Sequence, residues 1–133
     1  MVDPGAGKLD KMRQTVVAAS KQCGRSRLME VAEPVSWRDF VLRESARATI
    51  YVAHPSGENF DPRAAGTDRS CVFAIGPEGG FTDSEIELAS GHGAKLVSLG
   101  PRILRIETAA LALAALCALG CGDLEPERRT PGE

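Results

Sequence analysis

Two short glycine-containing runs have the residue types of ligand-binding turns. The first is Ile-Gly-Pro-Glu-Gly-Gly-Phe at residues 75–81, and the second is Leu-Gly-Pro-Arg-Ile-Leu-Arg-Ile-Glu-Thr-Ala at residues 99–109. Each run follows an apolar segment of strand length and precedes a helical pattern. Open α/β sheets bind their ligands at the carboxyl ends of the strands. The two runs therefore predict a single site that is built from both turns.

The turns lack the residues that hold a triphosphate. Backbone amides between a strand and a helix can bind phosphate, but the chain has no Gly-Lys-Ser/Thr and no Gly-x-Gly-x-x-Gly at a strand end. Pro77 and Pro101 remove amide donors and stiffen the turns. Rigid turns with few donors favour an adenine ring and a thioether ligand, and a nucleotide-binding domain of another class is the less favoured alternative.

The apolar pattern places both turns in an alternation of strands and helices. It predicts helices over residues 8–22, 36–46, 82–91 and 107–119, and buried strands over residues 48–53, 70–75 and 95–99. Thr82 and Glu85 have the spacing of a capping box at the start of the third helix. Residues 54–69 are polar and rich in Pro and Gly, so we expect a surface loop there. The alternation predicts an α/β fold with a mostly parallel sheet.

Composition and charge limit the classes of partner. The chain has 133 residues, of which 43% are hydrophobic, which is enough for one compact core. A net charge of -2 gives no global attraction to nucleic acid or membrane. Residues 8–27, however, contain six basic residues and one acidic residue, so the first helix carries a local basic surface. We expect residues 122–133 to form a disordered tail.

The cysteines and the apolar runs indicate no metal site and no membrane span. None of the four cysteines forms a Cys-x-x-Cys pair or lies near a histidine cluster, so neither a zinc site nor a disulfide scaffold is predicted. The longest apolar run, residues 109–119, is shorter than the roughly 20 residues that span a bilayer. The amino terminus has no signal-peptide pattern. We expect a cytoplasmic protein.

The two glycine runs resemble the signature motifs of the 16S rRNA (uracil N3) methyltransferase family of the SPOUT class. Gln-Cys-Gly-Arg-Ser-Arg at residues 22–27 resembles a third element of that family, at the expected place upstream. The resemblance extends from the first helix to the last, and residues 54–69 are the least similar part. It implies S-adenosylmethionine as methyl donor and N3 of a uridine in the 16S rRNA of the 30S subunit as acceptor.

The resemblance also implies an architecture. A partial SPOUT domain would cover residues 1–121, and its carboxyl-terminal part, about residues 75–115, would form a trefoil knot. Family members are homodimers, which makes the helices at 8–22 and 107–119 the expected interface. The family's amino-terminal RNA-binding β-barrel and the strand, helix and strand that follow it are absent here, so we expect an N-terminally truncated sheet. A non-catalytic module that dimerises or binds S-adenosylmethionine is therefore the alternative.

The resemblance places cofactor and RNA contacts on named residues. The cofactor contacts from the two turns are Ile75, Gly76, Gly80, Leu99, Gly100, Ile103, Leu104, Arg105, Thr108 and Ala109. The RNA contacts are Gln22, Arg25, Arg27 and Glu78. Glycines allow the backbone to approach a ligand, and leucine and isoleucine form an apolar wall for adenine. Ile106 stands where the family usually has threonine.

Methylation at uridine N3 requires stabilisation of negative charge on the base, because N3 is a weak acid. A cation or directed donors must hold the negative charge that develops on the base. Arg102 and Arg105 are the expected cations, with Arg25 also available, and Glu107 is the nearest candidate base in the sequence.

Each role has a structural alternative. Arg102 and Arg105 could bond turn carbonyls, and Glu107 and Thr108 could favour a helix start. Glu78 could be only a turn residue, and Arg25 and Arg27 only a solvated basic end. We expect neither His54 nor His92 to bind a ligand.

Overall fold

The computed structural model describes residues 6–67 and 70–120, and the chain divides into two compact units. The first unit ends at Ser36 and contains α1 (Ala6–Cys23) and an extended segment. The second unit begins at Trp37. Its elements are α2 (Trp37–Glu44), β1 (Thr49–Asn59), α3 (Pro62–Thr67), β2 (Cys71–Ile75), α4 (Asp83–Gly91), β3 (Lys95–Ser98) and α5 (Ile106–Gly120).

An ion pair joins the helix of the first unit to its extended segment. Arg13 on α1 donates from its guanidinium to Glu33 Oε1 at 2.6 Å and to Asp10 Oδ1 at 3.4 Å. The bond to Glu33 raises the pKa of Arg13. Both partners are solvent-exposed, so the pair adds little to stability. The helix ends at Gly24, whose φ of 71° suits a residue without a Cβ.

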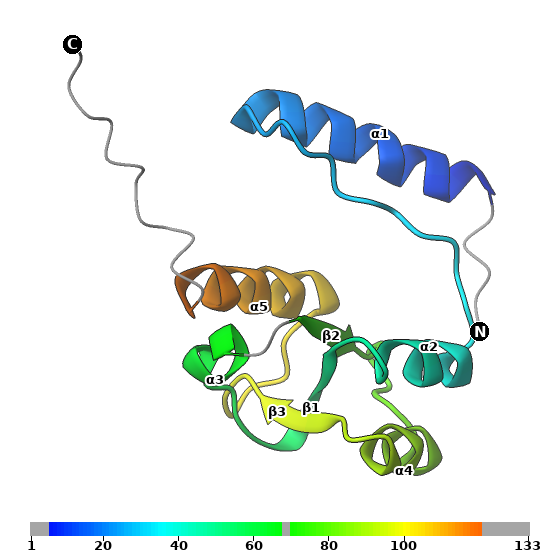
Figure 1. The fold of residues 1–133 in the computed structure, drawn as a ribbon, viewed down its shortest axis with the longest axis vertical. Coiled ribbons are helices and arrows are strands. Elements are labelled where there is room, and N and C mark those ends of the chain that lie inside the picture. The colour runs from blue at the N-terminus through cyan, green and yellow to red at the C-terminus, as the bar shows by residue number, and fades with distance from the viewer. Residues whose placement is uncertain (1–5, 68–69, 121–133) are drawn as a thin grey trace. The chain divides into compact units, whose positions relative to one another are not determined.

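The second unit is built on a three-stranded sheet in the order β2-β1-β3 (Figure 1). Both pairings are parallel, which confirms the predicted sheet. Ala53 of β1 is in register with Ile75 of β2 and with Val97 of β3. β2 and β3 therefore end at the same edge of the sheet, on either side of Ala53, and the segments that follow them start at that edge. β1 itself continues to Asn59.

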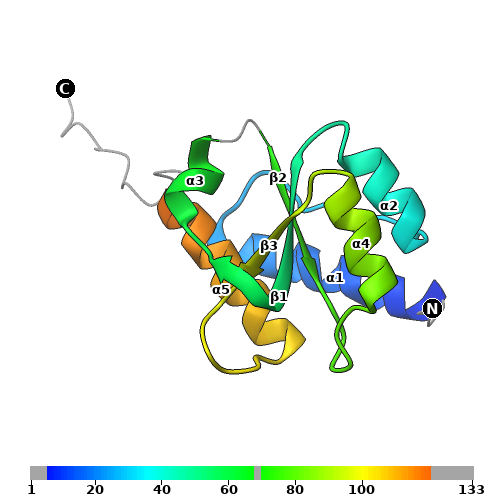
Figure 2. The same cartoon turned by 90° about the horizontal axis from the view of Figure 1, so that it is seen from below.

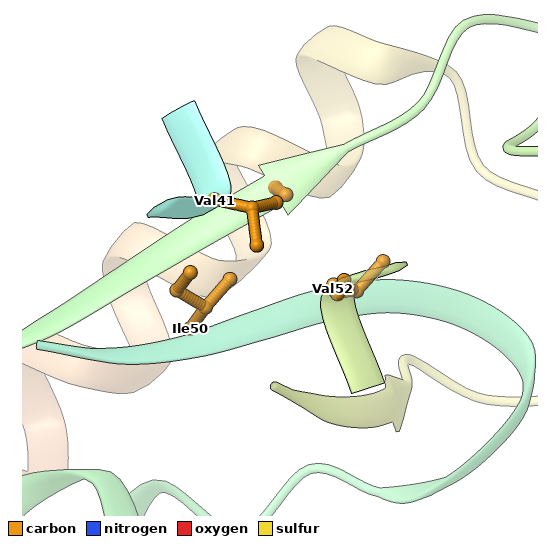
Figure 3. Close-up of a cluster of buried hydrophobic side chains, with 5 residues drawn as sticks. Val41, Ile50 and Val52 are labelled. Carbon is orange, nitrogen blue, oxygen red and sulfur yellow. The ribbon is translucent and has the colours of Figure 1, made fainter. Parts of the chain in front are cut away.

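Helices cover both faces of this sheet. Figure 2 shows α2 and α4 on one side of the strands and α3 and α5 on the other. Ile50 and Val52 of β1 pack with Val41 of α2 and Ala89 of α4 (Figure 3). Tyr51, which points to the opposite face, packs with Ala65 of α3 instead. This alternation along β1 is the period of two that a strand requires when both of its faces are buried.

The surface loop predicted for residues 54–69 is wrong. After an irregularity, β1 pairs with β3 again, with Glu58 opposite Val97, and α3 follows. The polar composition misled the prediction because this part of β1 is largely solvent-exposed. A local signal for α3 is present: the Asp61 side chain accepts from the Arg63 backbone N–H at 2.9 Å, and Pro62 occupies the first helical position, which suits proline.

The other predicted elements are confirmed to within a few residues at their ends. The capping box at the start of α4 is present: Thr82 Oγ1 accepts from the Glu85 N–H at 3.3 Å, and Glu85 Oε2 accepts from the Thr82 N–H at 2.8 Å. The trefoil knot and the domain limits at 1–121 stay predictions. The predicted tail, residues 122–133, lies outside the described residues. Within the described ranges, no helix is long and apolar enough to cross a membrane.

Gly57 provides a test of the β1–β3 pairing. A Cβ at this position would lie 2.5 Å from the Val97 backbone nitrogen, whereas a Cβ at Gly79 would meet nothing within 4 Å. We expect Gly57→Ala to lower the free energy of unfolding by about 1–3 kcal/mol because the backbones must separate. The matched variant Gly79→Ala should change it by less than about 0.5 kcal/mol. Urea denaturation measures both, and equal effects would contradict the close approach.

Candidate ligand-binding site

A cavity of about 450 Å³ opens at the edge of the sheet where β2 and β3 end. Its volume lies within the roughly 300–1,000 Å³ that small-molecule sites occupy. The middle of β1, where its pairing with β3 becomes irregular, contributes Ala53, His54 and Pro55, and the first glycine turn contributes residues 75–81. The end of β3 and the second turn contribute residues 97–100 and 102–106, and α5 contributes Ala109. Both glycine turns thus form one pocket.

The first turn is held by a hydrogen bond within it and by an aromatic ring that packs against it. Gly80 N donates to Pro77 O at 2.8 Å, which closes a tight turn, and Gly80 has a φ of 72°. A Cβ on Gly76 would lie 3.1 Å from the Phe81 ring, so that ring packs directly against the backbone of Gly76. The Phe81 ring in turn lies 4.9 Å from the ring of Trp37, centroid to centroid. The turn is therefore anchored to α2.

The second turn is held by a serine and a glycine. Ser98 Oγ accepts from Gly100 N at 3.2 Å and donates to Gly100 O at 3.3 Å. Gly100 has a φ of 104°, a conformation that residues with a Cβ rarely adopt. The chain then enters α5, where Ala109 N donates to Arg105 O at 2.9 Å. The positive end of the α5 dipole therefore lies at the pocket wall.

The charged groups of the pocket are few. Among the described residues that line it, the titratable side chains are His54, Glu78, Arg102 and Arg105. In the part of the chain that the structure describes, neither guanidinium donates to a turn carbonyl, so the geometry does not show the turn-bonding alternative for these arginines. No group of His, Cys, Asp or Glu in the described ranges could hold a metal ion.

The structure brings most of the predicted site residues together. The predicted residues that line the pocket are Ile75, Gly76, Gly80, Leu99, Gly100, Ile103, Leu104, Arg105 and Ala109, with Arg102 and Glu78 beside them. Ile75, Leu99 and Leu104 are half-buried, and the two arginines are solvent-exposed. The pocket therefore has apolar walls and an exposed basic rim.

Two predicted residues of the second unit, Glu107 and Thr108, are not among the residues that line the pocket. Glu107 and Thr108 belong to the first turn of α5 and are solvent-exposed. Gln22, Arg25 and Arg27 belong to the first unit and are also exposed. The catalytic, cofactor and RNA roles proposed for these five residues stay predictions.

Sequence reasoning missed the contribution of β1. Ala53, His54 and Pro55 line the pocket because β1 is the central strand and its neighbours carry the two glycine turns. Phe81 was also missed as a lining residue. A signal for β1 was available: in a parallel sheet, residues level with the carboxyl ends of the neighbouring strands lie at the edge where ligands bind. The strand order, however, could not be read from the sequence.

Comparison with known proteins gives consistent matches. Residues 3–118 match the family model of the RNA methyltransferase domain. The ribosomal RNA small subunit methyltransferase E of Synechocystis sp. is 37% identical over 125 residues, which are 90% of this chain and 41% of that protein.

Two solved structures resemble the chain closely. One, from Legionella pneumophila in complex with the cofactor SAM, matches 86% of this chain and 47% of its own, at 40% identity and a TM-score of 0.76. The other is a ribosomal RNA small subunit methyltransferase E from Neisseria gonorrhoeae bound to S-adenosyl methionine. It matches 89% of this chain and 50% of its own, at 31% identity and a TM-score of 0.74. The chain thus spans about half the length of these relatives.

Proposed function

The chain belongs to the RNA methyltransferase domain family, and from this premise we propose that it binds S-adenosylmethionine between the two glycine turns and transfers the methyl group to RNA. Its fold is the α/β fold of SPOUT methyltransferases. One observation carries the proposal: nine of the ten residues expected to contact the cofactor line one pocket, Thr108 being the exception. The SAM-bound neighbours from Legionella and Neisseria support it.

The pocket residues fit this cofactor. The half-buried side chains of Ile75, Leu99 and Leu104 offer apolar contact for an adenine ring. The absence of a side chain at Gly76 lets the Phe81 ring pack against the backbone of the first turn, which fixes this turn beside the pocket. Arg102 and Arg105 offer positive charge for the carboxylate of the methionine part. S-adenosylmethionine, when bound, supplies an electrophilic methyl group on its sulfonium.

We propose N3 of a uridine in 16S rRNA of the 30S subunit as the methyl acceptor. Two relatives carry the name ribosomal RNA small subunit methyltransferase E, which supports this substrate class. Arg102 and Arg105 would stabilise the negative charge that develops on the uracil oxygens as N3 loses its proton. Glu78 is the carboxylate among the described lining residues, so we place the proton acceptor there in preference to Glu107, which is not among them.

A methyl-transfer assay tests this function. The full chain is incubated with S-adenosylmethionine labelled in its methyl group and with 30S subunits that lack the modification. We expect label in 16S rRNA, and a loss of about 100-fold for Arg105→Ala because a charge-stabilising group is removed. Arg38→Ala, an exposed arginine of α2, is the matched control.

The outcomes separate the candidate functions. Transfer that is equally impaired in both arginine variants would contradict the role of Arg105. Binding of S-adenosylmethionine without any transfer would favour the non-catalytic module. Binding of ATP in place of S-adenosylmethionine would favour a nucleotide-binding domain of another class.

We also propose that the protein forms a homodimer through α5. On α5, Leu111 is 72% exposed and Leu119 is 61% exposed. Ala115 lies midway between them in the sequence, and residues four apart share one side of a helix, so the two leucines lie near the same face. Large apolar side chains gathered on one surface mark interaction sites. The predicted contribution of the helix at 8–22 to the same interface stays a prediction.

Sedimentation analysis tests the dimer. We expect the wild-type chain to sediment as a dimer at micromolar concentration. Leu111→Glu should weaken the dimer by at least about 10-fold, because it places a charge in an apolar interface. Leu42→Glu is the matched control: it makes the same change at a 45% exposed leucine of α2. A wild-type monomer, or equal weakening by the two variants, would contradict the proposed interface.

A further inference from the structure

His54 is a pocket residue with a defined hydrogen-bonding state. It lies on β1, the central strand, and its half-buried side chain lines the cavity between the two glycine turns. Its Nδ1 atom lies 3.2 Å from the backbone nitrogen of Ser56 and 2.7 Å from Ser56 Oγ. Both bonds are local, so the ring is held at the irregular part of β1 without any contribution from a ligand.

These bonds determine which ring nitrogen carries the proton. The backbone N–H of Ser56 can only donate, so Nδ1 must accept, and the Ser56 hydroxyl can turn to donate to the same atom. A neutral imidazole that accepts at Nδ1 carries its hydrogen on Nε2. In the part of the chain that the structure describes, Nε2 has no hydrogen-bond partner. His54 therefore holds one free N–H donor on a wall of the pocket.

Building on the proposed function, we propose that His54 binds the ribose of S-adenosylmethionine by donating Nε2–H to a ribose hydroxyl. The carboxylate of the methionine part has better partners in the two guanidinium groups of the second turn, Arg102 and Arg105. A neutral donor matches the neutral hydroxyls that lie between the adenine and the sulfonium. His54 also lies on the strand between the two turns that hold the cofactor, whereas the arginines form the exposed rim.

The same geometry disfavours His54 as a general base. To take a proton, the ring would have to accept it at Nδ1, because Nε2 already carries one. Protonated Nδ1 would then face the backbone N–H of Ser56, which cannot accept a hydrogen bond, so only the Ser56 hydroxyl could accept from it. Proton uptake would therefore cost His54 one of its two local hydrogen bonds, and we keep the proton acceptor at Glu78.

Calorimetric titration of the full chain tests the inference with two probes. S-adenosylhomocysteine contains adenine, ribose and the amino-acid part, and 5′-methylthioadenosine contains only the nucleoside with its thioether. We expect His54→Phe, which keeps a ring but no donor, to weaken both probes by a similar factor of about 5 to 10. His54→Gln, which can place an amide N–H near Nε2, should recover most of the affinity. His92→Phe is the matched control, because His92 lies outside the pocket lining at the end of α4.

The two probes separate the possible failures. If the wild type binds neither probe nor S-adenosylmethionine, the proposed function fails and this inference fails with it. If the wild type binds both probes and His54→Phe binds them as tightly, only this inference is overturned. A loss for S-adenosylhomocysteine without a loss for 5′-methylthioadenosine would assign His54 to the amino-acid part and overturn the ribose contact.

A second measurement does not depend on any variant folding. Long-range ¹H–¹⁵N NMR spectra of the wild-type chain distinguish a protonated from an unprotonated ring nitrogen. We expect the unprotonated nitrogen of His54 to be Nδ1 at neutral pH, and the Nε2 proton to shift when S-adenosylhomocysteine binds. Protonation at Nδ1 would overturn the inference.

Discussion

The parallel pairing of β1 with both β2 and β3 is the constraint on which the rest of the site depends. Since Ala53 is in register with Ile75 on one side and Val97 on the other, β2 and β3 end at one edge of the sheet, on either side of β1. Residues that are far apart in the sequence then share a pocket. If either β2 or β3 alone ran antiparallel to β1, the two glycine turns would lie at opposite edges. The burial of Ile50, Tyr51 and Val52 on alternating faces of β1 holds the strand in the middle of the sheet.

The pocket combines stiff turns with small residues. The first turn is backed by the Phe81 ring, which contacts Trp37, whose indole N–H donates to Glu85 O of α4 at 3.0 Å. The second turn is closed on itself by Ser98 and Gly100. Turns that are already ordered lose little conformational entropy when a ligand binds. Stiff turns can hold a cofactor while the exposed rim of the pocket stays open to a large substrate.

Local features of this structure could be predicted from the sequence, and long-range ones could not. Thr82 and Glu85 predicted the start of α4, because a capping box depends only on residues that are close together in the sequence. The glycines of both turns revealed the pocket because their positive φ values and close contacts are local requirements. The extension of β1 depends on pairing with β3, which residues 54–59 do not encode alone. The role of His54 as a lining residue depends on the same strand order.

An NMR titration of the full chain with S-adenosylmethionine tests the central claim, that both glycine turns hold the cofactor together. The account predicts that the amide signals of Gly76, Gly80 and Gly100 shift with one common dissociation constant. The signals of Gly91 and Gly93, at the end of α4, should stay in place. Shifts confined to one turn, or a saturable response only outside the pocket, would contradict the account.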